Sequence, residues 1–198
     1  VPPACNDGGI PIGAALYYYH NILGRRRNYS LNQNIAFLGL SYHINENELS
    51  QFKYLKFNDW DSLLKKVSEL LWRNKIIAWY QGRSESGPRA LGNRSIFASP
   101  SNISNKGKLN CIKRRQPWRP VAPIMTKETV SKFFESNGDY RYMLFNPKVK
   151  NSKIKEIPAV IHIDETSRVQ TVTKERNEKM YGLLKEFGQY LLSNKKWW

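Results

Sequence analysis

The sequence predicts an α+β fold in which helices and strands are mixed. Segments with apolar residues at helical spacing are interspersed with short apolar runs typical of strands, without the strict βαβ alternation of a doubly wound sheet. Of the 198 residues, 40% are hydrophobic and 24% charged, a balance that indicates a globular chain rather than a disordered one. This length suits one domain, or one domain with a fragment of another.

The first 58 residues are predicted to hold a turn, two helices and a strand. Asn6-Asp7-Gly8-Gly9 has the composition of a turn, and Ile10 to Leu23 has the small and apolar residues of a buried helix. Ile35 to Gly39 is a short apolar run that favours a strand. Residues 41–58 are rich in Asn, Glu and Lys, and we expect a connector there with a short helix around Glu46 to Phe52.

The central part is predicted as helix, strand, loop and strand. Asp59 or Asp61 can cap a helix that runs to about Arg73, because apolar residues recur at helical spacing after them. Lys75 to Tyr80 is typical of a buried strand, and Ser95 to Ala98 resumes as a strand after the intervening loop.

A short helix is predicted from Asn105 to Cys111. Pro117 to Met125 is expected to be extended, because three prolines exclude a regular helix. The hydroxyl of Thr126 is predicted to cap a further helix that ends at Phe134.

The last third is predicted to hold three strands and one long helix. The strand candidates are Arg141 to Phe145, Ala159 to Ile163 and Arg168 to Val172. Glu175 to Leu192 is amphipathic, with its apolar residues on one helical face.

The charge balance is the first functional indication. The net charge of +16 attracts anions such as phosphates, nucleotides, nucleic acid or acidic lipid, unless the cations are simply scattered over the surface. The two cysteines, Cys5 and Cys111, form neither a CxxC pair nor a disulfide framework, which predicts a reducing, cytoplasmic setting. No apolar run reaches the roughly 18 residues of a membrane span.

Residues 82–95 have the composition of an oxyanion site. Three glycines let the backbone approach a ligand closely, and guanidinium groups match the oxygens of phosphate or carboxylate. The candidate donors of this segment are Arg83, Arg89, Asn93, Arg94 and Ser95. The alternative is a structured loop whose arginines pair with Glu85 and nearby carboxylates.

Three other segments carry weaker indications. Residues 113–120 place four cations in seven positions beside Trp118, which suits phosphate or nucleic-acid binding but also a solvated basic loop. Arg168 begins an apolar strand and is either a ligand or a rim residue. Asp7 precedes two glycines, a pattern that can ligate a metal beside a nucleotide but is also common turn chemistry.

These segments, in this order, resemble the carbamoyltransferase family that includes nodulation protein U and the antibiotic-tailoring O-carbamoyltransferases. The family pattern GR-x-E-x-GPRALGNRS is similar to residues 82–95, and K-x-R-E-x-FRP-x-AP to residues 113–123. H-x-D-x-T-x-RVQTV is similar to residues 162–172, and P-x-x-x-DGG-x-x-x-GAAL to residues 3–16. Ser86 and Gln116 depart from the bulky residue and the Glu that family members usually carry there.

The resemblance implies a fold and an activity. It implies that residues 1–40 end an actin-like ATPase-type domain, that residues 41–58 are a connector and that residues 59–198 form a truncated YrdC-like domain. The implied activity is ATP-dependent activation of carbamoyl phosphate to carbamoyl adenylate, for transfer to a hydroxyl group of a sugar or natural product. Mg²⁺ with ATP, and Fe(II) or a similar divalent metal, are the implied ions.

The resemblance also implies residue roles. The cationic positions that hold carbamoyl phosphate and the nucleotide phosphates are Arg89, Lys113, Arg119 and Arg168. Further cofactor contacts fall on Arg83, Asn93, Arg94, Ser95, Gly8 and Gly9. Asp7 matches the last metal ligand, whose His partners lie upstream in the family. Because the family segment that completes the nucleotide pocket follows the final helix, the isolated chain is expected to bind ligand weakly or to be inactive.

Two rival interpretations stay open. The chain could be a basic YrdC-like nucleic-acid-binding module, which would show a steep salt dependence of RNA binding. It could also be a non-catalytic, truncated remnant of an enzyme.

Overall fold

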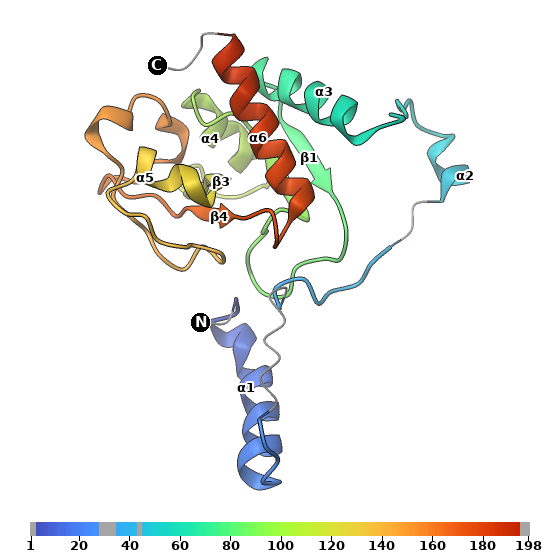
Figure 1. The fold of residues 1–198 in the computed structure, drawn as a ribbon, viewed down its shortest axis with the longest axis vertical. Helices are drawn as coiled ribbons and strands as arrows, with labels where there is room; N and C mark the ends of the chain where they lie inside the picture. The colour runs from blue at the N-terminus through green and yellow to red at the C-terminus, as the bar shows by residue number, and fades with distance from the viewer. Residues whose placement is uncertain (1–2, 28–34, 43–44, 195–198) are drawn as a thin grey trace.

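The computed structural model describes residues 3–27, 35–42 and 45–194. Its elements intermix helix and strand, which confirms the predicted α+β class (Figure 1). In chain order, the principal elements are α1 (Ile10–Tyr17), α2 (Glu46–Leu49), α3 (Trp60–Trp72), β1 (Ile77–Tyr80), β2 (Arg94–Phe97), α4 (Ser104–Ile112), β3 (Ile124–Thr126), α5 (Val130–Phe133), β4 (Gln170–Val172) and α6 (Glu178–Ser193).

The strands of the described part form two small sheets. β1 and β2 are antiparallel, with Ile77 opposite Phe97 and Tyr80 opposite Arg94, so residues 81–93 form the loop of a hairpin. β3 and β4 are parallel, with Ile124 opposite Gln170. This long-range pairing brings residues 168–170 beside the segment that follows α4.

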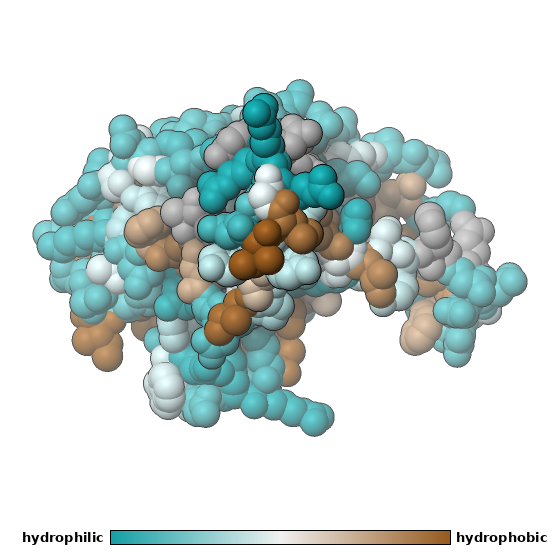
Figure 2. All heavy atoms as spheres, turned by 90° about the horizontal axis from the view of Figure 1, so that it is seen from below, coloured by the Kyte–Doolittle hydropathy of each residue, from teal (hydrophilic) through white to brown (hydrophobic). Residues whose placement is uncertain are grey.

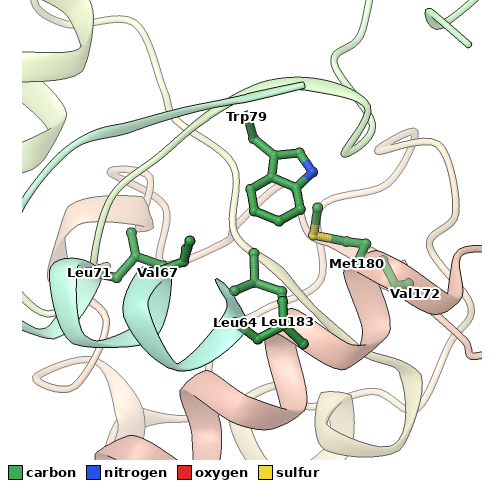
Figure 3. Close-up of a cluster of buried hydrophobic side chains, with 7 residues drawn as sticks. All are labelled: Leu64, Val67, Leu71, Trp79, Val172, Met180 and Leu183. Carbon is green, nitrogen blue, oxygen red and sulfur yellow. The ribbon is translucent and has the colours of Figure 1, made fainter. Parts of the chain in front are cut away.

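One core cluster holds the two long helices against both sheets. α3 and α6 lie side by side, and Figure 3 shows their apolar side chains meeting below the indole of Trp79. The buried members of the cluster are Leu64, Val67, Leu71, Trp79, Val172, Met180 and Leu183. Burying each such side chain contributes about 1.5 to 3 kcal/mol, so the cluster fixes the hairpin and β4 relative to each other.

A second cluster supports the other side of β4. It surrounds Val130 of α5, Phe134 at the end of that helix and Val169, all at most 1% exposed, and continues through residues 149–160. Ser167 and Val169, on either side of Arg168, are fully buried, whereas Arg168 itself is only partly buried.

Most predicted helices are confirmed, and their caps explain their starts. Asp59 accepts a hydrogen bond from the backbone N–H of Ser62 and begins α3. Asn177 accepts a hydrogen bond from the N–H of Met180 and caps α6, which therefore begins at Glu178 rather than at Glu175. The predicted Thr126 cap is wrong: its hydroxyl faces that of Thr129, and the helix begins as a 3₁₀ turn.

Three predicted strands are wrong. Residues 141–145 form turns, in which Met143 has a φ of +55° that no strand allows. Pro158–Val160 is a 3₁₀ helix, because proline favours the first turn of a helix. Residues 35–39 form a turn and irregular backbone, whose carbonyl and amide groups bond instead to residues 84 and 86 of the hairpin loop.

The predicted helix from Ile10 to Leu23 exists, but its predicted burial is wrong. α1 continues as a π-helix, Tyr18–Ile22, and projects away from the rest of the chain (Figure 1). Its apolar side chains are half exposed or more, and Figure 2 shows hydrophobic surface on this projection. Within the described residues, nothing covers the helix that its composition requires to be buried.

Among residues 3–27, 35–42 and 45–194, no helix is both long and apolar enough to cross a membrane.

Candidate functional site

The carboxylate of Glu85 fastens the hairpin loop 81–93 through backbone N–H groups, not through the loop arginines. Glu85 Oε1 accepts hydrogen bonds from the backbone N–H groups of Leu91, Asn93 and Arg94, at 2.8, 2.9 and 3.1 Å. Gly92 has a φ of +107° and lies against Met180, so a side chain there would be strained. The alternative in which the loop arginines pair with Glu85 is therefore wrong.

Arg89, near the middle of this loop, faces a cavity of about 320 Å³. This volume lies within the range that small ligands occupy. Arg89 Nε is buried, and none of the described residues accepts a hydrogen bond from it. A buried donor without a partner is costly, about 1 to 3 kcal/mol, unless a ligand or water satisfies it.

Cations from two other parts of the chain line the same cavity. Lys113 lies at the C-terminal cap of α4, Arg115 follows it, and Arg168 precedes β4. None of the ion pairs among the described residues involves these side chains or Arg89. Four cations therefore share one cavity without a carboxylate in ion-pair contact.

Burial, and to a smaller extent repulsion between neighbouring cations, lowers the pKa values of Arg168 and Lys113. Burial is the larger cause, and the charge of Arg89 the smaller one, of the lowered pKa of Arg168. Desolvation is the larger cause, and the charge of Arg115 the smaller one, of the lowered pKa of Lys113, an exposed residue that also lines the cavity. An anion in the cavity would reverse both effects, because it offsets like-charge repulsion at short range.

The rest of the cavity lining combines neutral polar and apolar residues. Ser95 and Gln170 contribute neutral polar groups, although Gln170 Nε2 already donates to the carbonyl of Leu91 at 2.7 Å. Apolar side chains from α3, β2, β3 and α6 also line the cavity. The cavity can thus hold an anionic group together with a less polar body.

The other predicted residues of the loop lie elsewhere. Arg83 and Asn93 line a second cavity with Gln81, Arg176 and Asn177. Asn93 Nδ2 donates to the carbonyl of Arg83 at 2.7 Å, and Asn93 Oδ1 accepts from Gln81 and Asn177.

Arg94, also a predicted contact, is surrounded by its own loop. Its guanidinium donates to the carbonyls of Gln81, Gly82 and Asn93 at 2.6 to 3.0 Å, and it stacks 3.6 Å from the ring centroid of Tyr80.

Arg119 does not line the cavity. It is exposed two residues after Pro117, and its charge contributes to the lowered pKa of Arg115, after desolvation. Sequence reasoning named neither Arg115 nor Gln170 as site residues. Arg115 lies within the basic block 113–120, which offered no means of choosing among its cations, and Gln170 carried no signal of its own.

The predicted residues at the N-terminal turn lie apart from the cavity. Asp7 is exposed in a 3₁₀ turn, and among the described residues no group of three or more metal-ligating side chains exists. These residues alone do not form a metal site. Gly9 is explained by packing, because a Cβ there would lie 2.1 Å from the carbonyl oxygen of Ala4.

The geometry defines a class of protein: an α+β domain with a cavity lined by four cations, an arrangement whose charge suits an anion. Comparison with known proteins gives the family. The family model described as carbamoyltransferase C-terminus matches residues 68–193, which include all four cavity cations. The chain therefore belongs to the carbamoyltransferase family and corresponds to its C-terminal portion.

Named relatives agree with this assignment. Nodulation protein NolNO of Sinorhizobium fredii is 34% identical over 194 residues, which cover 94% of this chain and 28% of the relative. Nodulation protein U of Bradyrhizobium diazoefficiens is 33% identical, with 96% and 32% covered. 3'-Hydroxymethylcephem-O-carbamoyltransferase of Streptomyces clavuligerus is 30% identical, with 96% and 34% covered. The chain spans about a third of the length of these relatives.

Proposed function

We propose that the chain carries the carbamoyl-activating site of an ATP-dependent O-carbamoyltransferase. The observation that supports this most strongly is the cavity with four cations, Arg89, Lys113, Arg115 and Arg168, and no carboxylate in ion-pair contact. Carbamoyl phosphate and the phosphates of ATP are compact anions that such a cluster suits.

The proposed reaction needs positioned charge more than a side-chain nucleophile. Carbamoyl phosphate, water and ATP give carbamoyl adenylate, orthophosphate and pyrophosphate, so negative charge develops on phosphoryl oxygens. Arg89 and Arg168 hold these oxygens with planar, permanently charged donors, and Lys113 adds a point charge. Ser95 contributes a neutral hydroxyl group to the same cavity. Mg²⁺ bound with ATP supplies further neutralisation of phosphate charge.

We also propose the domain arrangement that the family resemblance implies. Residues 59–198 then form a YrdC-like domain, residues 41–58 a connector, and residues 1–40 the end of an actin-like domain. The exposed apolar helix α1 supports this arrangement, because a helix of that composition needs a covering body. Asp7 would offer one carboxylate to a divalent metal, but no step is assigned to it.

The proposed carbamoyl acceptor is a hydroxyl group of a small molecule. One relative is named for a 3'-hydroxymethylcephem, an acceptor with a hydroxymethyl group. A sugar or natural-product hydroxyl is consistent with this chemistry.

The test is carbamoyl-phosphate-dependent exchange of pyrophosphate into ATP by the full-length protein. We expect Arg89→Ala and Lys113→Ala to lower the exchange rate by about 10²-fold, as loss of one charge-stabilising donor commonly does. Lys108→Ala is the matched control for Lys113→Ala: it removes an exposed lysine of the same helix that does not line the cavity. Absence of exchange, or wild-type rates in both cavity variants, would overturn the proposal.

One observation favours the nucleic-acid alternative. Trp118 is 71% exposed beside the exposed cations Arg114 and Arg119, an arrangement that can stack a base and hold its phosphate. RNA binding with a steep salt dependence, unaffected by ATP or carbamoyl phosphate, would support this function instead.

A further inference from the structure

The cations of segment 113–120 lie on irregular backbone that needs an external support. After α4 ends, Arg114 takes a φ of +48°, and the segment contains Pro117 and Pro120, which offer no N–H groups for local hydrogen bonds. Most of its residues are exposed. Such a segment holds a cation at a cavity wall only if a rigid neighbour fixes it.

Asn110, in the last turn of α4, provides that support. The residue is 1% exposed. Its Nδ2 donates to the carbonyls of Pro117 and Arg119, both at 2.9 Å. Its Oδ1 accepts from Arg115 Nε at 2.6 Å. Because two partners are carbonyl acceptors and the third is a guanidinium donor, only one orientation of the amide satisfies all three.

These bonds decide where the Arg115 charge lies. Arg115 Nη2 also donates to the carbonyl of Pro120 at 3.2 Å, so the guanidinium is fixed on two sides. Arg115 Nη1 takes part in no hydrogen bond among the described residues, and the residue lines the cavity. The fixed side chain therefore keeps Nη1, with its two N–H groups, for a ligand.

We propose that Asn110 is a positioning residue of the anion site: it locks segment 113–120 and aims the guanidinium of Arg115 into the cavity. This inference rests on the proposed function only in taking the ligand to be a phosphate compound. Asn110 itself touches no ligand and acts through Arg115.

A double-mutant cycle with inorganic pyrophosphate as the probe tests the inference. Calorimetric titration of the full-length protein measures pyrophosphate affinity for wild type, Asn110→Ala, Arg115→Ala and the double variant. We expect each single variant to bind about tenfold more weakly, the effect of losing one charge-assisted hydrogen bond. Because both changes remove the same contact, the double variant should be no more than about twofold weaker than Arg115→Ala.

Hydrogen exchange of the backbone gives a second readout that needs no ligand. We expect segment 113–120 to exchange faster in Asn110→Ala than in wild type. Thr171→Val is the control, because Thr171 is also buried and its hydroxyl fastens a different loop through Asp139 and Tyr140. It should change neither exchange in 113–120 nor pyrophosphate affinity. If Asn110→Ala does not fold, Asn110→Asp keeps the acceptor for Arg115 but loses both donors, and should also speed exchange.

Unchanged affinity in Asn110→Ala, a double variant weakened about a hundredfold, or unchanged exchange in segment 113–120 would each overturn the inference. A full-length wild-type protein that binds no pyrophosphate would overturn it together with the proposed function. Pyrophosphate binding with the expected cycle, but no carbamoyl-phosphate-dependent exchange into ATP, would reject the proposed reaction and leave the role of Asn110 intact.

Discussion

Two arginines of the same hairpin, Arg89 in its loop and Arg94 at the start of β2, have opposite surroundings. Arg94 donates to three backbone carbonyls and stacks on Tyr80. Arg89 has a buried Nε with no acceptor among the described residues, and it faces a cavity shared with Arg168 and Lys113. The first side chain holds the hairpin together, whereas the second is a charge that the fold leaves uncompensated.

Both residues are arginines, so residue type does not distinguish them. The number of hydrogen bonds that the protein itself makes to each guanidinium distinguishes a structural cation from a binding cation. A guanidinium that gives three of its five N–H groups to carbonyls, as Arg94 does, has fewer left for a ligand. A desolvated guanidinium beside other cations is energetically unfavourable, and an anion that binds there stabilises it. Three predictions sharpen this comparison.

The largest effect is expected at the cavity. Arg168→Ala should lower carbamoyl-phosphate-dependent pyrophosphate exchange by about 10²-fold or more, because it removes a partly desolvated charge from the phosphate site. Its free energy of unfolding should stay within about 0.5 kcal/mol of wild type, since no described residue pairs with its guanidinium and its loss relieves repulsion with Arg89. The exchange assay measures the rate, and urea denaturation measures the free energy of unfolding. A large loss of stability with an unchanged exchange rate would show that Arg168 is a structural cation and not a binding cation.

The opposite pattern is expected at Arg94. Arg94→Ala should lower the free energy of unfolding by about 2 to 3 kcal/mol, because it removes hydrogen bonds to three carbonyls and a cation–π contact. Well below its lowered Tm, the variant should retain exchange within about fivefold of wild type. Arg94 would belong to the binding machinery if stability held while exchange collapsed.

The smallest effect is expected at Asp139, a cation partner outside the cavity. Burial opposes its ionisation, but hydrogen bonds from Arg176, Arg141 and Thr171 lower its pKa to about 2. A lowered carboxyl pKa contributes stability that is full above the unfolded value of 3.8 and is lost as the pH falls toward 2.

Asp139→Asn should therefore destabilise the chain by about 1 kcal/mol at pH 7, a figure discounted because the group is largely exposed. The difference from wild type should shrink between pH 5 and pH 2. Urea denaturation across this range measures it, and a pH-independent difference would show that the charge of Asp139 contributes nothing.

Local signals in the sequence predicted much of the fold. Asp59 before a helical pattern located α3, and the apolar face of residues 175–192 located α6, because both depend on residues close in sequence. β3 and β4 are three residues long and pair across 43 intervening positions (127–169), so no local pattern could reveal that they are neighbours. The turns at 141–145 depend on Met143 in a left-handed conformation that its side chain does not favour.

The site was predictable in composition but not in arrangement. The glycine and arginine content of residues 82–95 indicated an anion site, yet the sequence could not sort its three arginines. Arg83 donates to the carbonyls of Leu38 and Gly39, more than 40 residues away, and only the folded chain reveals such partners. Asn110 was missed because a buried asparagine in a short helix has no signature in sequence.

The central claim, that the uncompensated cations form a phosphate site, is tested most directly with phosphonoacetamide. This compound replaces the labile ester oxygen of carbamoyl phosphate with a methylene group. Calorimetric titration compares wild type, Arg89→Ala and Arg94→Ala, all below their Tm. The account predicts that Arg89→Ala weakens binding at least tenfold and that Arg94→Ala binds within about twofold of wild type. Equal affinity for wild type and Arg89→Ala, or loss of binding in Arg94→Ala alone, would contradict it.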